Sequence, residues 1–162
     1  MSKQLIEAGV EFAWHYTTGQ IFKAIADRGM LLTENETTPE AIIPGLLGGV
    51  WFSLRQDYEP TACKRIIFTD GRTRRGTWEE TIEMGGGAVR IGVAVDAPFL
   101  LTWNGYRDRC TCEKKYIRQL RDVALMRGSN VHQFRVSLTS VPRAHWMAVE
   151  TLKDGKWKPV EV

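Results

Sequence analysis

The sequence predicts an α+β domain with a few short helices and mostly antiparallel strands. Three observations support this class. Apolar and polar residues alternate over 11–17 and 89–95, which is typical of strands. Apolar residues recur at helical spacing over 116–124, and Asp154-Gly155 is a hairpin signal. The chain has 162 residues, 43% of them hydrophobic and 25% charged, so we expect a single domain spanning 1–162.

The first segment is expected to run strand, helix, strand. Residues 11–17 form the strand, and Thr17-Thr18-Gly19-Gln20 follows the capping-box pattern with Thr17 as the N-cap. The helix that follows presents one apolar face, formed by Ile21, Phe22, Ile25 and Ala26. Gly29 is expected to end this helix, and residues 30–32 to form a short strand.

The middle of the chain mixes loops and short elements. Periodicity fails over 33–48, which predicts a long lid or binding loop, and 50–53 is a short apolar strand. The expectations that follow are a helix at 60–67 with Pro60 in its first turn, a basic loop at 70–76, and strands at 78–84, 89–95 and 100–103.

The last third is expected to hold the longest helix and several strands. Residues 112–127 carry apolar side chains at helical spacing, and Gly128 follows as a stop signal. Strands are predicted at 134–138 and 145–152. The turn Asp154-Gly155 then leads into a final strand at 157–160.

Composition excludes several classes of protein. No stretch approaches the roughly 18 apolar residues that a membrane helix needs. The first residues contain no apolar signal core, so a cytoplasmic protein is expected. The three cysteines are an odd number, which argues against a disulfide framework. Cys110-Thr111-Cys112 does not have zinc-ribbon spacing, so no metal site is expected. The default interpretation is two reduced thiols.

One ordered set of short motifs stands out. Trp14-His15-Tyr16-Thr17 is followed by a helix, Gly29 and a long loop, and the loop leads into Gly49-Val50-Trp51-Phe52-Ser53. This order resembles the first half of the ADP-ribosyltransferase superfamily, and its poly(ADP-ribose) polymerase branch above all. The RNA 2′-phosphotransferases are relatives that share the opening motif. The resemblance covers about residues 12–62, and it implies a split antiparallel β core with NAD as the substrate.

The resemblance implies a role for each motif residue. His15 would hold the ribose of the adenosine half of NAD and belong to the catalytic machinery, and Thr17 would lie near the same ribose. The backbone of Tyr16, at a position where the family has Gly, would face the nicotinamide carboxamide. Further NAD contacts are implied for Trp51, Ser53 and Tyr58. By default Trp51 is equally a core residue, because it lies on an apolar strand.

The family also uses a carboxylate beside the sugar cation that forms when nicotinamide leaves. Glu150 is the first candidate, because it follows an apolar strand near the C-terminus, where the family's Glu also lies. Glu59, next to Tyr58, is the second candidate. No motif fixes either one, and a surface strand position is the commoner role for a residue such as Glu150.

Two basic stretches could meet phosphates of NAD or of a nucleic acid, although charged surfaces are usually only solvated. Residues 64–75 hold five basic side chains and one acidic one, and residues 107–127 hold seven and three. The whole chain has a net charge of only +3. The two local excesses of positive charge make a nucleic-acid acceptor one expectation, through Arg72, Arg74, Arg75, Lys115 and Arg118.

Three functions remain open at this point. The first is transfer of ADP-ribose from NAD to a macromolecule. The second is an RNA 2′-phosphotransferase-like reaction, for which Arg65, Arg90 or Arg118 would hold a phosphate. The third is a non-catalytic binding or inhibitor protein that keeps the fold. Tyr16 in place of Gly and the lack of a firm Glu motif favour this third function.

Overall fold

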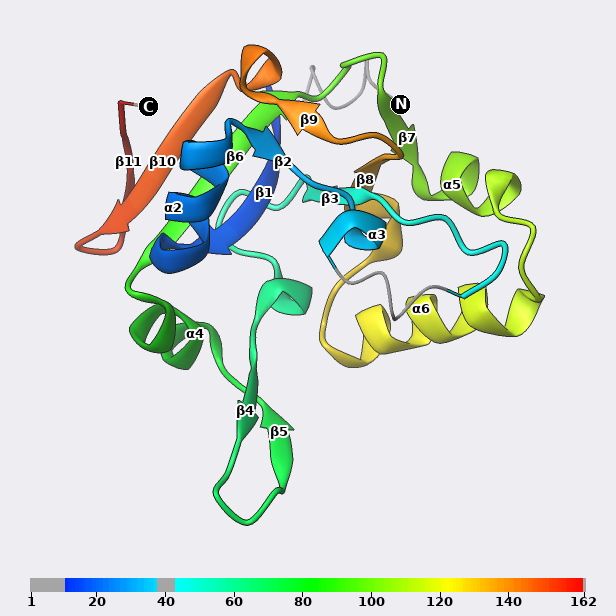
Figure 1. The fold of residues 1–162 in the computed structure, drawn as a ribbon, viewed down its shortest axis with the longest axis horizontal. Helices are drawn as coiled ribbons and strands as arrows, with labels where there is room; N and C mark the ends of the chain where they lie inside the picture. Colours follow the sequence, from blue (N-terminus) through cyan, green and yellow to red (C-terminus); the bar gives the residue numbers. More distant parts are fainter. Residues whose placement is uncertain (1–10, 38–42, 162) are drawn as a thin grey trace.

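Seven antiparallel strands form one sheet in the order β11-β10-β6-β1-β3-β8-β7 (Figure 1). The computed structural model describes residues 11–37 and 43–161, and these form a mixed α+β fold, as the sequence predicts. The strands are β1 (Phe12–Thr18), β3 (Val50–Ser53), β6 (Ala88–Ala94), β7 (Leu100–Thr102), β8 (Phe134–Ser137), β10 (Ala148–Lys153) and β11 (Lys156–Pro159).

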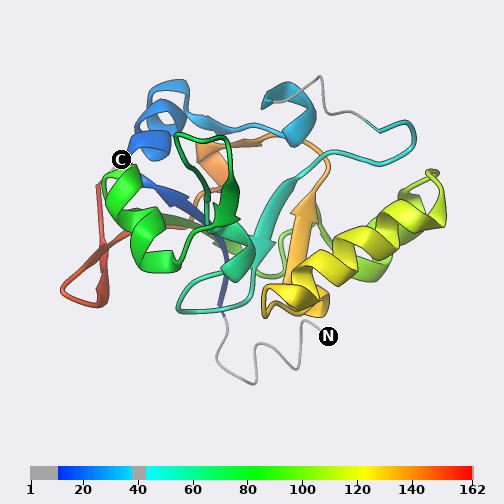
Figure 2. The same cartoon turned by 90° about the horizontal axis from the view of Figure 1, so that it is seen from below.

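Two small sheets accompany the main one. Strand β2 (Met30–Leu31) pairs with β9 (Val141–Pro142), and β4 (Arg65–Ile67) pairs with β5 (Thr73–Arg75). The helices are α2 (Gly19–Arg28), α3 (Glu34–Thr37), α4 (Trp78–Gly85), α5 (Trp103–Arg109) and α6 (Lys114–Met126). Figure 2 shows α2 and α4 on one side of the molecule and α6 on the other.

Strand alternation gives the main sheet two separate cores. On β3, Val50 and Phe52 pack with Ile25 of α2 and Leu31 of β2 on one face. Trp51, one position along, packs on the opposite face in a second cluster. That cluster contains Trp103 and Tyr106 of α5, Ala124 of α6, Val131 and Val136. Helices therefore cover both faces around β3.

The sheet face that carries Trp51 also carries a buried arginine, away from β3, with aromatic rings packed around it. Arg90 of β6 donates to Glu150 of β10 at 2.6 Å and to the carbonyl of Gln56 at 2.6 Å. Its guanidinium carbon lies 3.8 Å from the ring centroid of Trp14 and 4.5 Å from that of Trp157. These contacts join β1, β6, β10 and β11.

Several predicted elements are confirmed, with small shifts at their ends. Helix α2 ends at Gly29, which is left-handed at φ 69°. Its N-cap is Thr18 rather than Thr17, and that side chain makes no capping hydrogen bond. Strand β1 instead continues through Thr17 in its pairing with β6. The predicted turn is confirmed by positive φ angles at Asp154 and Gly155.

Other predictions are wrong. Residues 78–84 form helix α4 rather than a strand, because Thr77 and Glu80 make a reciprocal capping box at its start. The helix expected at 60–67 is a 3-10 turn, Pro60–Ala62, followed by strand β4. The predicted loop at 70–76 contributes the partner strand, β5.

Two further helices were not predicted. Helix α5 begins directly after β7, where the hydroxyl of Thr102 accepts from the backbone N–H of Gly105. Helix α3 lies inside the predicted loop at 33–48, of which residues 38–42 lie outside the described part. Among the described residues, no helix is long and apolar enough to cross a membrane.

Removing the buried arginine should weaken the whole sheet. Arg90→Ala leaves the largely buried carboxylate of Glu150 without its ion pair, so the free energy of unfolding should fall by about 3–5 kcal/mol. Urea unfolding monitored by tryptophan fluorescence measures this change. The exposed Arg109→Ala is the control and should change stability by less than about 0.5 kcal/mol. Equal stability of both variants would contradict the role of Arg90.

Candidate functional site

Strands β1 and β3 are neighbours that separate almost at once. A single ladder pair, Trp14 with Ser53, joins them. By contrast, every residue from Phe12 to Thr18 pairs with β6, and all four residues of β3 pair with β8. Each strand is thus held firmly on its outer side, and the sheet opens between them beyond the Trp14–Ser53 pair.

His15 spans this opening. Its Nδ1 lies 2.9 Å from the backbone carbonyl of Trp51 on the opposite strand. A carbonyl can only accept, so Nδ1 carries the proton and Nε2 of a neutral ring is an acceptor. Desolvation lowers the pKa of His15 below 6.5. The hydrogen bond to Trp51 raises this pKa in part, and the nearby charge of Lys64 lowers it again. The imidazole is therefore neutral at pH 7.

A cavity of about 570 Å³ lies at the opening. This volume is within the range of small-molecule and cofactor sites, about 300–1,000 Å³. Its walls come from α2, α3 and α6 as well as the two strands, and from residues 59–64. The sequence-predicted site residues that line it are His15, Tyr16, Thr17, Trp51, Ser53 and Glu59.

Glu59 is the best-organised carboxylate at the cavity. It is only 6% exposed, and its Oε1 accepts from the N–H of Thr61 at 3.2 Å, from the hydroxyl of Thr61 at 2.9 Å and from the hydroxyl of Ser129. Its Oε2 accepts one bond, from Ser53 at 2.7 Å. A carboxylate oxygen has more than one acceptor site, so Oε2 keeps capacity for a ligand.

Glu34 is a second carboxylate of the cavity lining, and it belongs to none of the sequence motifs. It begins the short helix α3. Desolvation raises the pKa of Glu34 above 4.5, although hydrogen bonds from the side chain of Trp51 and the backbone of Gly49 lower it. A carboxyl group with a raised pKa in a cavity is a candidate for proton transfer.

Basic residues also contribute to the wall of the cavity. Arg28, Lys64 and Arg127 come from α2, from the segment before β4 and from the end of α6. Desolvation, with the charge of Arg75, lowers the pKa of Lys64 and also lowers that of Arg127, where Arg65 adds to the effect. Lys64 and Arg127 thus share a cluster of positive charge with Arg65 and Arg75.

Tyr16 lines the cavity but directs its ring to other contacts. Its hydroxyl donates to the carbonyl of Arg55 at 2.5 Å, and its ring packs near those of Trp78 and Trp157. Desolvation raises the pKa of Tyr16 to about 12. Neighbouring side chains on a strand point to opposite faces, so the phenol and His15 project from different faces of β1.

Glu150 and Tyr58 do not line the cavity. Glu150 pairs in register with Arg90, which in turn pairs with Tyr16, so it lies two strands from β1 on the side away from β3. Its carboxylate is bound by Arg90. The ring of Tyr58 stacks on Trp78 at 5.2 Å between centroids.

The basic residues that were expected to contact a nucleic acid differ in their hydrogen-bond and ion-pair partners. Arg72 is paired with Asp70 at 2.6 Å, Arg74 with Glu80 at 2.7 Å and Lys115 with Glu113 at 3.6 Å. Arg118 is exposed on α6. Arg75 donates to the carbonyl of Cys63.

Comparison with protein-family models, curated proteins and solved structures gave no match to this chain.

Other cavity residues had no sequence signal of their own. Glu34 and Arg127 became visible only when distant segments came together around β3. Ser129, which holds Glu59, follows α6 by a few residues and is 70 positions from its partner. Glu59 directly precedes Pro60, which is typical of the first position of a helical turn. Its carboxylate caps this 3-10 turn by accepting from the N–H of Thr61.

The lowered pKa of His15 should make stability depend on pH. Between its folded-state pKa and 6.5, the unfolded chain binds a proton at His15 that the folded chain does not. The free energy of unfolding should therefore rise with pH across this window and fall as pH drops below 6.5. His15→Gln should flatten that part of the profile, measured by urea unfolding between pH 5 and 8. An identical slope in both proteins would contradict the assignment.

Proposed function

We propose that this protein transfers ADP-ribose from NAD to a macromolecular acceptor. The observation that carries the proposal is the opening between β1 and β3, where His15, Trp51 and Glu59 surround one cavity. The motifs that resemble the ADP-ribosyltransferases thus meet at a single site. Neither motif alone would require this.

The nicotinamide end of NAD fits the opened strand edge. Beyond the Trp14–Ser53 pair, no ladder pair within the described chain joins Tyr16 to β3. Backbone N–H and C=O groups along such an edge can bind a carboxamide, which offers one donor group and one acceptor. The side chain of Tyr16 does not block this contact, because its phenol is held at Arg55 on the other face.

The ribose and phosphates have matching groups. Nε2 of the neutral His15 is an acceptor for a ribose hydroxyl. The guanidinium of Arg28 and the ammonium of Lys64 bring positive charge to the lining, as a pyrophosphate requires. The cavity thus offers polar partners for the carboxamide, a ribose and the phosphates of NAD.

The reaction breaks the bond between C1′ of the ribose and the ring nitrogen of nicotinamide. The bonding electrons go to that nitrogen and neutralise its positive charge, so C1′ becomes an oxocarbenium cation. The acceptor then supplies the electron pair of a new bond to C1′ and loses a proton. The fixed carboxylate of Glu59 would stabilise the cation, and Glu34, with its raised pKa, could take the proton.

A phosphotransferase-like reaction on RNA is the second candidate, and the basic wall of the cavity favours it. Such a reaction needs a cation that holds a 2′-phosphate near the ribose of NAD, and Lys64 and Arg127 are placed in the lining. Arg90, one of the residues expected to serve, is engaged by Glu150. Release of phosphate from 2′-phosphorylated RNA separates the two reactions.

NAD should bind to the purified protein, and His15→Ala should weaken the complex. Loss of one hydrogen bond to the ribose costs about 0.5–1.5 kcal/mol, or up to about 10-fold in Kd, as measured by isothermal titration calorimetry. His132→Ala, on an exposed histidine outside the cavity lining, is the matched control and should leave the Kd unchanged. Absence of NAD binding by the wild-type protein would refute the proposal and favour a non-catalytic role.

Glu59→Gln should separate binding from catalysis. The amide keeps the shape of the side chain but removes the negative charge, so transfer of labelled ADP-ribose should fall by about 10²–10³-fold with a similar Kd for NAD. Glu83→Gln, on an exposed carboxylate of α4, is the control for the loss of one charge and should keep full activity. Full activity of Glu59→Gln would remove Glu59 from the mechanism.

A further inference from the structure

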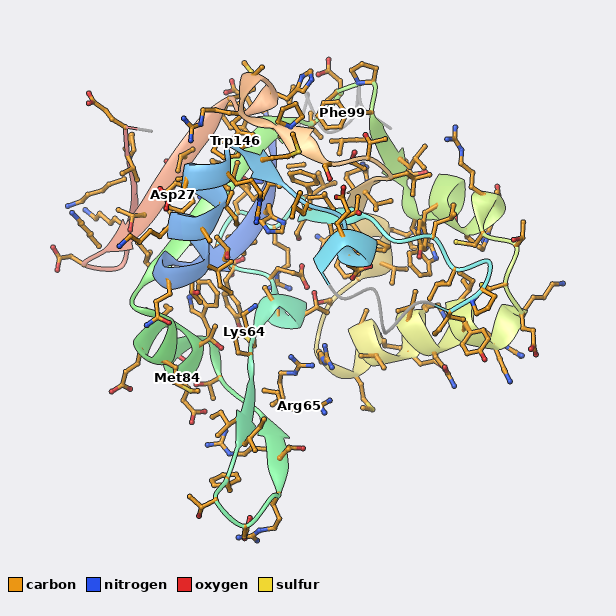
Figure 3. All side chains as sticks on the ribbon, viewed as in Figure 1. Asp27, Lys64, Arg65, Met84, Phe99 and Trp146 are labelled. Carbon is orange, nitrogen blue, oxygen red and sulfur yellow. The ribbon has the colours of Figure 1, made fainter. Side chains whose placement is uncertain are left out.

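The hairpin formed by β4 and β5 stands apart from the main sheet. It forms a two-stranded sheet of its own, and Figure 1 shows it projecting from the body of the molecule. Its base joins the segment 59–64, of which Glu59, Thr61, Ala62 and Lys64 line the cavity, and Lys64 immediately precedes β4. Figure 3 labels Lys64 and Arg65 at this base, with Arg65 on the side toward α6.

The base of the hairpin carries uncompensated positive charge. Arg65 and Arg75 are directly opposite each other in the ladder, where like charges destabilise the pairing. Arg127, at the end of α6, is close enough for both arginines to lower its pKa, and Arg75 does the same to Lys64. Within the described chain, none of these four side chains belongs to an ion pair.

The remaining charges of the hairpin are neutralised, which sets this cluster apart. Arg72 is paired with Asp70, and Arg74 makes two hydrogen bonds to Glu80. The sequence stretch is therefore not uniformly basic in space. Its free positive charge is concentrated at the base, beside the cavity, where an anionic ligand would relieve the repulsion.

The tip of the hairpin adds an exposed aromatic ring. Phe68 is 42% exposed, and its neighbour Ile67 is 73% exposed. The guanidinium carbons of Arg72 and Arg74 lie 6.0 Å and 5.7 Å from the ring centroid of Phe68. Neither apolar side chain packs in the two cores of the main sheet. An exposed aromatic ring on the same hairpin as a cluster of free cations is a combination that can bind unpaired bases and their phosphates.

We propose that a single-stranded nucleic acid binds along this hairpin, with phosphates at Arg65, Arg75 and Arg127 and a base stacked on Phe68. Resting on the proposed function, we infer that this strand is the acceptor of ADP-ribose. An acidic peptide would use the cluster but not the ring, and a duplex would hide its base faces from Phe68. The combination of cluster and ring therefore favours a single strand.

Fluorescence anisotropy of the full chain with labelled 12-nucleotide oligonucleotides, in the absence of NAD, tests the binding surface. Oligothymidine and oligouridine distinguish DNA from RNA, and a duplex and a poly-glutamate competitor represent the other ligands. Binding should weaken as salt rises from 50 to 200 mM, with a slope of about −0.7 for each phosphate contact. Arg65→Gln should make this slope shallower by about 0.7.

Phe68→Ala should weaken binding by about 10-fold and leave the salt slope unchanged, because stacking releases no counterions. Phe68→Trp should retain the affinity, which separates loss of the ring from a folding defect. Lys153→Gln, on the exposed end of β10, is the control and should bind as the wild type does. The binding claim is overturned if no oligonucleotide binds at 50 mM salt, if poly-glutamate or the duplex binds equally well, or if Phe68→Ala has no effect.

A parallel titration with NAD alone separates this inference from the proposed function. If NAD binds and no oligonucleotide does, the inference fails and the proposed function stands. If an oligonucleotide binds and NAD does not, the proposed function fails, and the acceptor role fails with it. If both bind, labelled ADP-ribose should appear on the oligonucleotide, and its absence there would overturn the acceptor role.

Discussion

The candidate site depends on one interruption of the main sheet, the loss of pairing between β1 and β3 after Trp14 and Ser53. Each strand stays in place because its outer neighbour holds it along its length. Close packing helps to hold β3 against β8. A Cβ atom at Gly49 would lie 2.4 Å from the side chain of Val136, so only glycine lets the residue before β3 approach β8 this closely. The hydrogen bond from His15 to Trp51 then spans the gap without closing it.

The electrostatics of the cavity follow from the same opening. The segment after β3 turns at Glu59, whose carboxylate is fixed by Ser53, Thr61 and Ser129, so a negative group stands at one wall without an ion-pair partner in the described chain. Lys64 follows a few residues later and brings positive charge to the rim. One short stretch of chain thus places a negative and a positive group on different parts of the site. The proposed reaction needs both, because the oxocarbenium cation is stabilised by a carboxylate and the phosphates of NAD by a cation.

Sequence reasoning could reach the local features but not the strand order. It identified β1, α2, β3 and α6 from periodicity, and it placed His15, Trp51 and Ser53 near one site on the basis of motif order. The apolar strand before Glu150, near the C-terminus, favours it over Glu59, and no local pattern reveals that β10 joins the sheet beyond β6. The sequence predicts a strand where helix α4 lies, although Thr77 and Glu80 have the spacing of the capping box that starts this helix.

The most direct test of the account is a crystal structure of the protein with NAD. The account predicts the nicotinamide between β1 and β3, with its carboxamide on the backbone of Tyr16, a ribose hydroxyl at Nε2 of His15 and the carboxylate of Glu59 facing C1′. A continuous ladder between β1 and β3, or NAD bound beside Glu150 on the far side of β6, would contradict it.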